Sequence, residues 1–259
     1  QNPLSIEQEL MRPSMLPGMC GVISHNLKRY ARRNSFFEIG KIYKSNRGSL
    51  EEKPVLSLGI AGLKREDWKS RKEGFDFFDM KGIFERLMDG LGLNGEIAFR
   101  NNDVPGLRKG QSAVVSSGKD IIASLGEVGP VISAEHDIKG RVFYCEVYLN
   151  ELGKKVRLEK RYVLCGKYPP ISRDVSILMD KSATSQEVTN IIREVGWPLV
   201  RAVRLVSIYK GKEIPEGKRA LLYRIEYRSD EKTLEDAEVE KVHNDVRNSL
   251  SEKLNVSFR

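Results

Sequence analysis

The chain has 259 residues and a formal net charge of +8, with 40% hydrophobic and 31% charged residues and no low-complexity run. It has no run of 18 apolar residues, which argues against a membrane span, and its first residues lack the layout of a secretory signal. Three scattered cysteines predict reduced thiols in a cytoplasmic protein, with no metal site. Because the first residue is Gln1, we expect a piece of a longer protein.

The first half of the sequence alternates helical and extended patterns. An amphipathic helix is predicted over 16–33, followed by strands over 34–43 and 55–63. The clearest helix spans 76–93, and its inward stripe is predicted to consist of Met80, Ile83, Phe84, Leu87, Met88 and Leu91. Four further strands are predicted, over 96–100, 111–117, 120–128 and 141–149. These apolar patterns indicate a packed core rather than a site.

A change of composition marks a boundary between two domains. The segment 153–167 is strongly charged, and Pro169 and Pro170 follow it and force an extended path. The predicted division is therefore a domain over 1–152, a linker over 153–167 and a second domain over 168–259.

The second half has a regular order of elements. A strand over 173–180 precedes a helix that opens with a Thr184-x-x-Glu187 capping box and ends at Gly196. Strands over 200–209 and 218–227, a helix after Leu234 and a short strand in the tail complete the order β-α-β-β-α-β. This is the ferredoxin-like arrangement, in which two helices cover one face of a four-stranded antiparallel sheet. The other face stays open, and an open sheet face is a common platform for RNA.

The basic residues are concentrated before the last helix. Residues 160–228 contain twice as many Lys and Arg as Asp and Glu, whereas 229–259 has an excess of carboxylates. Around one turn stand Tyr209, Lys210, Lys212, Lys218 and Arg219. Such a cluster suits a polyanion, and the alternative is an ordinary hairpin with a solvated tip.

Six stretches carry a resemblance to a known family. They are NPLSIEQELMRPSMLPG (2–18), FFEIGKIY (36–43), DFFDMKG (76–82), SLGEVGP (124–130), YPPISRDVSILMD (168–180), and IYKGKEIPEGKRALLYRIEY together with KTLEDAEVEKV. In this order they make the chain resemble the C-terminal part of the bacterial phenylalanyl-tRNA synthetase β subunit. The resemblance implies an α+β fold: a degenerate class II aminoacyl-tRNA synthetase catalytic-like module, with an antiparallel sheet and helices, and then a ferredoxin-like βαββαβ anticodon-binding domain. It also implies a cytoplasmic (αβ)₂ heterotetramer with the α subunit, and binding of the tRNA(Phe) anticodon stem-loop.

No catalytic residue is predicted in this chain. A working class II site holds the phosphates of ATP with arginines, because guanidinium groups match phosphate geometry. The stretch LGEVGPVISAEHDI (125–138) stands where one such arginine is expected and offers Glu127 and Glu135, which would repel a nucleotide. Arg12 is either a remnant or a surface or packing residue. We therefore expect a subunit of an enzyme that has no active site or cofactor of its own, with ATP and Mg²⁺ bound elsewhere in the holoenzyme.

The resemblance also points to an RNA-binding set. The family motif Phe-Asp-x-Tyr-x-Gly corresponds to VSIYKG (206–211), so Tyr209 is kept and Ser207 replaces the acid. The resemblance implies that the tyrosine and the residue in place of the acid face the open side. Strand alternation agrees, since it puts Ser207 and Tyr209 on one face and Val206 and Ile208 on the other. The predicted cationic rim for backbone phosphates consists of Lys210, Lys212, Lys218, Arg219, Arg224 and Arg228. Two alternatives remain: a structural module that only completes the heterotetramer, with no significant RNA contact, and a free-standing regulatory or RNA-binding relative.

Overall fold

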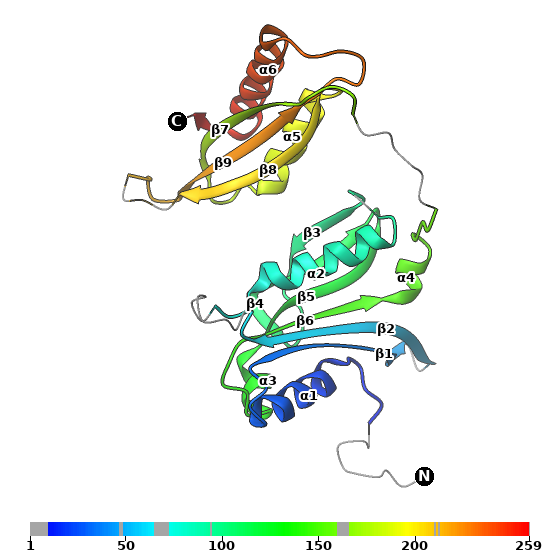
Figure 1. Ribbon diagram of the computed structural model, residues 1–259. Helices are drawn as coiled ribbons and strands as arrows, with labels where there is room; N and C mark the ends of the chain where they lie inside the picture. The colour runs from blue at the N-terminus through cyan, green and yellow to red at the C-terminus, as the bar shows by residue number, and fades with distance from the viewer. Residues whose placement is uncertain are drawn as a thin grey trace. The chain divides into compact units, whose positions relative to one another are not determined.

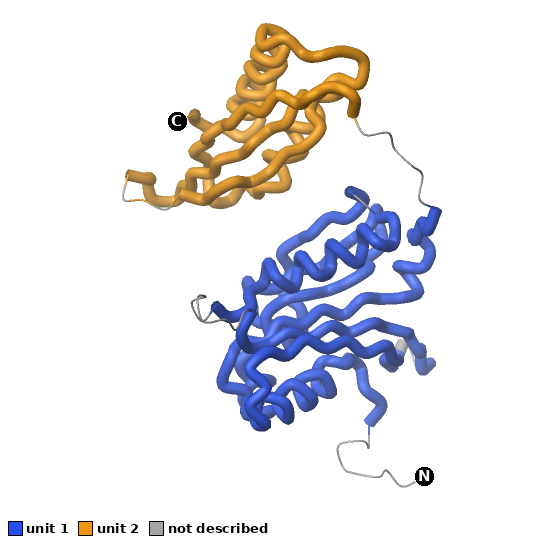
Figure 2. The backbone as a smooth tube through the Cα atoms, in the orientation of Figure 1, with its two compact units in different colours: residues 1–161 blue, residues 162–259 orange. Residues whose placement is uncertain are grey.

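The computed structural model describes residues 10–46, 49–64, 73–93, 95–159, 166–209, 211 and 213–258. The chain divides into two compact units, Gln1–Arg161 and Tyr162–Arg259 (Figure 2). The ends of the predicted linker over 153–167 stay predictions, since residues 160–165 lie outside the described ones. Across the described ranges, no helix is both long enough and apolar enough to cross a membrane.

Unit 1 is built on a six-stranded antiparallel sheet in the order β1-β2-β6-β5-β4-β3 (Figure 1). Its elements in chain order are α1 (Leu16–Lys28), β1 (Arg33–Asn46), β2 (Ser49–Gly62), α2 (Phe77–Gly90), β3 (Ile97–Asn101), β4 (Leu107–Ser117), β5 (Asp120–Val128), α3 (Pro130–Glu135), β6 (Val142–Tyr148) and α4 (Leu149–Gly153). Each predicted helix and strand of the first half has a counterpart among them. Helix α1 stops five residues earlier than predicted, and Tyr30, just beyond it, adopts a left-handed φ of 64° that cannot continue the helix.

The two faces of this sheet carry different helices. Helix α2 packs through Met80, Phe84 and Met88 on the face that contains Phe143, whereas α1 packs on the face of the neighbouring residue Tyr144. Since successive residues of a strand point to opposite faces, α1 and α2 lie on opposite sides. The prediction that Ile83 points inward is wrong, because this side chain is 41% exposed and lies beside the buried stripe rather than on it.

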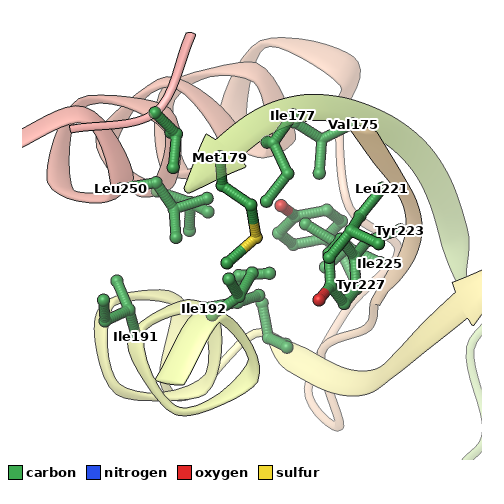
Figure 3. Packing of buried hydrophobic residues seen from close by; sticks show 14 of the residues in the cluster. Val175, Ile177, Met179, Ile191, Ile192, Leu221, Tyr223, Ile225, Tyr227 and Leu250 are labelled. Atoms are coloured by element: carbon green, nitrogen blue, oxygen red, sulfur yellow. The ribbon is translucent and has the colours of Figure 1, made fainter. Parts of the chain in front are cut away.

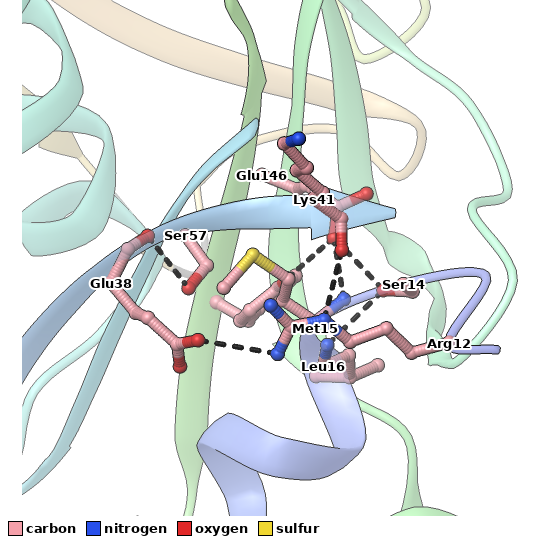
Figure 4. Close-up of polar contacts among 9 residues, drawn as sticks. Arg12, Ser14, Met15, Leu16, Glu38, Lys41, Ser57 and Glu146 are labelled. Carbon is pink, nitrogen blue, oxygen red and sulfur yellow. Dashed lines mark hydrogen bonds and ion pairs between the residues drawn. The ribbon is translucent and has the colours of Figure 1, made fainter. Parts of the chain in front are cut away.

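A buried carboxylate fixes the start of α1 to the sheet (Figure 4). Glu146 of β6 is 5% exposed, and its Oε2 accepts hydrogen bonds from Ser14 Oγ at 2.9 Å and from the Met15 backbone N–H at 3.0 Å. The Tyr144 hydroxyl donates a third bond to the same oxygen at 2.7 Å. A charged acceptor therefore ties the segment before α1 to the middle of the sheet.

Unit 2 has the predicted order of elements, which confirms the ferredoxin-like fold. It comprises β7 (Ile171–Asp180), α5 (Ser185–Gly196), β8 (Val200–Tyr209), β9 (Lys218–Tyr227), α6 (Asp236–Leu254) and β10 (Ser257–Phe258), with antiparallel strand order β10-β7-β9-β8. The capping box of α5 is also confirmed, since Thr184 Oγ1 accepts from the Glu187 N–H at 3.2 Å and the Glu187 carboxylate accepts from the Thr184 N–H.

The core of unit 2 lies between the sheet and its two helices (Figure 3). Strand β7 contributes Val175, Ile177 and Met179, and β9 contributes four alternate side chains from Leu221 to Tyr227. All of them are at most 4% exposed. Because α5 and α6 both pack on these residues, the odd-numbered positions of β7 and β9 face the helices and the even-numbered ones face away.

Candidate nucleic-acid interface

The helix-free face of unit 2, here called the open face, is the candidate site. Cross-strand pairing assigns residues to it, because two residues directly opposite in an antiparallel pair point to the same side. On β9 the open face holds Leu222, Arg224 and Glu226, and Asp174 is the β7 partner of Arg224.

Strand β8 reaches this face through Ser207 and Tyr209, as predicted. Ser207 is paired with Leu222. Tyr209 is paired with Ala220, which stands two positions before Leu222 in β9. Tyr209 is 50% exposed. A Cβ atom at Gly211 would lie only 2.6 Å from the Tyr209 ring, so this glycine leaves the space that the ring occupies.

A β-bulge in β8 changes which residues share the open face. The register shifts between Leu205 and Ser207, so Val206 has no partner on β9. Beyond the bulge, Ile208 is paired with the core residue Leu221 and faces the helix side, although it is 48% exposed. On the near side, Arg204 is paired with Arg224 and therefore lies on the open face, where the sequence did not predict it.

The arginines of the open face are held by carboxylates. Arg224 donates from Nε and Nη2 to the two oxygens of Asp174, both at 2.8 Å, and this ion pair raises the pKa of Arg224 and lowers that of Asp174. Arg204 Nη2 lies 3.6 Å from Glu226 Oε1, and its side chain is 71% exposed. Since Arg204 is the more exposed of the two, it is the better placed to meet a phosphate oxygen.

The remaining predicted cations that the structure describes do not all lie on the open face. Arg228 follows β9, is half-buried and lies 3.6 Å from Asp230, while Lys218 is half-buried at the start of the strand. Arg219 is paired with the core residue Met179 and donates to the Ala183 carbonyl, so it lies on the helix side and does not belong to the open face.

Two predicted site residues, Lys210 and Lys212, lie outside the described residues. Lys218 has the parity of Arg224 and is paired with Asp180, so it also lies on the open face. The structure therefore brings together Ser207, Tyr209, Lys218 and Arg224 from the predicted set and adds Arg204. Whether any of these side chains contacts RNA stays a prediction.

In unit 1, the stretch predicted to repel a nucleotide has a different electrostatic character. Glu127 is 3% exposed, and Arg141 donates to its Oε2 from two nitrogens, at 3.0 and 2.7 Å, while Arg108 lies 3.2 Å from Oε1. The carboxylate is thus neutralised, and the repulsion argument is wrong for this residue. The two arginines are instead engaged by Glu127.

Arg12 and Glu135 complete the set considered in unit 1. Arg12 is a surface residue: its side chain is 42% exposed and donates to the Lys41 carbonyl at 2.9 Å and to Glu38 at 3.2 Å (Figure 4). Glu135 is exposed at the end of α3. Within the described ranges, no three His, Cys, Asp or Glu side chains gather as a metal site would require.

Comparisons with known proteins place both units. Residues 166–259 match the family described as ferredoxin-fold anticodon binding domain, which agrees with the fold of unit 2. Residues 1–149 match the family described as phenylalanyl tRNA synthetase beta chain CLM domain. The chain belongs to the phenylalanyl-tRNA synthetase β-chain family, which confirms the resemblance drawn from the sequence.

Curated relatives agree along the whole chain. The phenylalanine–tRNA ligase β subunit of Clostridium acetobutylicum is 31% identical over 262 aligned residues, covering 100% of this chain and 32% of that protein. That of Dehalococcoides mccartyi is 33% identical, again over 100% of this chain and 32% of the relative. The chain thus spans about a third of the length of these relatives. A solved pyrrolysyl-tRNA synthetase of Desulfitobacterium hafniense aligns with 56% of this chain and 48% of its own, at 18% identity and a TM-score of 0.43.

Proposed function

We propose that the chain is the portion of a phenylalanine–tRNA ligase β subunit that binds the tRNA(Phe) anticodon stem-loop and packs on the catalytic α subunit. In this proposal the (αβ)₂ holoenzyme aminoacylates tRNA(Phe) in the cytoplasm, using ATP and Mg²⁺ bound outside this chain. The observation that carries the RNA-binding role is the presence of Tyr209, Arg204 and Arg224 on one helix-free sheet face in a domain of the anticodon-binding family.

The chemistry of the open face suits a splayed single-stranded loop. A half-exposed tyrosine ring stacks on an unpaired base, which contributes about 1–3 kcal/mol per base and needs no sequence-specific edge. Guanidinium groups beside it contact backbone phosphates and set the position of the loop. Ser207, with one hydroxyl, offers a weaker acceptor for a base amino group than the acid it replaces.

The test is binding of a tRNA(Phe) anticodon stem-loop by fluorescence anisotropy, at low and at moderate salt. Tyr209→Ala is expected to weaken binding by about 1–3 kcal/mol at both salts. Arg204→Gln is expected to lower the slope of log K against log salt by roughly 0.7–0.9, as the loss of one phosphate contact requires. Tyr30→Ala, in unit 1, and Lys241→Gln, on α6, are matched controls because both remove exposed side chains that are not part of the open face.

Equal binding by all five proteins would leave the structural alternative, in which the chain only assembles the heterotetramer. A specific observation supports a docking role in addition to RNA binding. Phe37 and Ile39 lie two positions apart on edge strand β1, on one face, and are 73% and 66% exposed. Exposed apolar side chains on a long edge strand are typical of a surface that another chain covers.

Docking is tested by co-purification of the full β subunit with its α subunit. Changing Phe37 and Ile39 together to Ser is expected to reduce the recovered α subunit. Phe78→Ser is the control, since Phe78 is 71% exposed on α2 instead. Retention of the α subunit by the double variant would place the interface elsewhere.

A further inference from the structure

A buried carboxylate of unit 1 lies between two arginines that come from different parts of the sheet. Glu127, close to the end of β5, is only 3% exposed. Arg108 of β4 places its Nε 3.2 Å from Oε1 of this carboxylate. Arg141, which precedes β6, donates from Nε and Nη2 to Oε2, at 3.0 and 2.7 Å. Each carboxylate oxygen is therefore engaged by a different guanidinium group.

The two arginines reach the carboxylate from the solvent side. The side chains of Arg108 and Arg141 are 48% and 53% exposed, in contrast to the buried carboxylate. Leu107 is paired with Val128, and both pack in the cluster of α1, so the adjacent Arg108 and Glu127 point to the opposite face of the sheet. Because the guanidinium groups are the exposed part of this cluster, they are accessible to an ion in solution.

The charge of the cluster is that of an arginine site with an oxyanion bound. Two guanidinium groups share the Glu127 carboxylate, so a net positive charge remains, and Asp76 adds only a weaker electrostatic attraction to Arg141. Arg108 turns Nε alone to Glu127, so its guanidinium has further N–H donors for a second oxygen. The guanidinium carbon of Arg141 lies 4.8 Å from the centre of the Phe143 ring, a contact that positions Arg141 independently of the carboxylate.

We propose that Arg108 and Arg141 form an oxyanion site in unit 1 and that Glu127 is its built-in occupant. The Glu127 carboxylate stands where two oxygens of a free sulfate or phosphate would bind, and it excludes such ions from the site. Glu127 outcompetes a free ion because it is tethered beside the arginines, at a high effective concentration. This assignment depends neither on RNA binding by unit 2 nor on docking of the α subunit. If the cluster is only a structural ion pair, removal of Glu127 creates no site.

The experiment removes the occupant and supplies sulfate as the probe. Glu127→Ala deletes a group of about the size of a sulfate ion and leaves both arginines in place. Sulfate is expected to bind this variant with a Kd on the order of 1 mM. In calorimetry of the 259-residue chain, about 20 mM sulfate should then raise the Tm of unit 1 by roughly 4–7 °C more than in the wild type. Chloride at equal ionic strength is the reference, and the response of the wild type measures the general stabilising effect of sulfate.

Three further variants separate the site from the loss of one charge. Glu127→Gln fills the same space with a neutral amide and should gain little from sulfate. Adding Arg108→Met to Glu127→Ala should abolish the gain, because the site needs both arginines. Glu38→Ala is the matched control, since it takes the carboxylate from Arg12 in an exposed pair with one arginine and should respond as the wild type does. If Glu127→Ala does not fold in chloride, Glu127→Ser, which keeps a hydroxyl, is measured in the same way.

NMR of the arginine side chains locates the bound ion. In Glu127→Ala, the Nε–H signals of Arg108 and Arg141 should shift with sulfate and saturate. The proposal is overturned if the Tm of Glu127→Ala responds to sulfate no more than that of Glu38→Ala. It is also overturned if Glu127→Gln gains as much as Glu127→Ala, because the amide leaves no room for the ion. Saturable shifts of these two signals in the wild type would likewise show that Glu127 does not occupy the site.

Discussion

Replacement of Glu146 tests how much of the stability of unit 1 depends on one buried carboxylate. In Glu146→Ala, the Tyr144 hydroxyl and the Met15 N–H both lose their acceptor. Both residues are buried, since Tyr144 is 3% exposed and Met15 is 1% exposed. Each buried group left unpaired costs about 1–3 kcal/mol. Ser14 is half-buried and can bond to water instead. Part of the loss is recovered, because the carboxylate no longer pays for its own desolvation.

The net expectation is a destabilisation of unit 1 by about 2–4 kcal/mol. For a unit of this size, each kcal/mol lowers Tm by roughly 2–4 °C, so the transition should move by roughly 5–15 °C. Glu146→Gln keeps an acceptor oxygen and should fall between the wild type and the alanine variant. Burial raises the pKa of Tyr144, and the charge of the neighbouring Glu146 raises it further. The hydroxyl therefore stays protonated throughout the test.

Differential scanning calorimetry of the 259-residue chain measures the shift, and hydrogen exchange of α1 amides reports where the structure loosens. Glu135→Ala is the control, since Glu135 is exposed at the end of α3. A Tm for Glu146→Ala within about 2 °C of this control would refute the reasoning, since even 1 kcal/mol should move the transition that far. Unchanged exchange in α1 would refute the proposed anchoring even if Tm fell.

Two further predictions concern the cores of the two units. Burial lowers the pKa of His243, whose Nδ1 lies 3.0 Å from the Tyr227 hydroxyl, so folded unit 2 takes up a proton less readily than the unfolded chain does. The free energy of unfolding of unit 2 should therefore reach its maximum above about pH 6.5 and decrease as the pH drops below that value. In His243→Gln, the urea midpoint should decrease less with falling pH than in the wild type. In unit 1, a Cβ at Gly126 would lie 2.6 Å from the Gln111 carbonyl oxygen, so Gly126→Ala should cost about 1–3 kcal/mol in chemical denaturation. Gly140→Ala, which meets open space, should cost far less.

The order and limits of the elements of unit 2 could be predicted because the signals are local. The capping box at Thr184, the alternation of 218–227 and the helical stripe after Leu234 each act within a few residues, and each has its counterpart in the structure. Even the position of Arg219 was readable, since it has the parity of Leu221 and Tyr223 on the covered face. The sequence analysis nevertheless assigned Arg219 to the cationic rim, because Arg219 is close in sequence to other cations.

The position of Arg204 could not be predicted because it depends on a bulge. Counting back from Tyr209 in steps of two gives Ser207, Leu205 and Val203, which would put Arg204 on the helix side. The bulge at Val206 inserts one residue, so Leu205 faces the core residue Tyr223 and Arg204 faces the open side. A bulge is set by pairing between strands and has no reliable signature in the single strand.

The partners of the buried charges were equally inaccessible to sequence reasoning. Glu127 on β5 is neutralised by Arg108 from β4 and by Arg141, which immediately precedes β6, and these residues are far apart in the chain. The sequence showed an acid without an adjacent cation, and only the sheet order β6-β5-β4 brings the two cations to it. The electrostatics of such a site follow from topology rather than from composition.

The pairing of Arg224 with Asp174 leads to a prediction for RNA binding that separates two roles of the acid. If Asp174 only holds the guanidinium, Asp174→Asn releases Arg224 for a phosphate and removes a negative charge from the open face. Affinity for the anticodon stem-loop should then rise at low salt by up to about fivefold, the equivalent of one exposed ion pair. The slope of log K against log salt should steepen by roughly 0.7–0.9.

The contrary result would be as informative. Asp174 lies on the same face as Ser207, which stands where the family motif has an acid, and a carboxylate is a strong acceptor for a base amino group. Weaker binding by Asp174→Asn, sensitive to the base presented in the loop, would mean that Asp174 reads a base and that Arg224 only orients it. Asp245→Asn on α6 removes an exposed carboxylate from the helix side and controls for net charge alone. An equal rise in both variants would show that the effect is long-range attraction, with no local role for the Asp174–Arg224 pair.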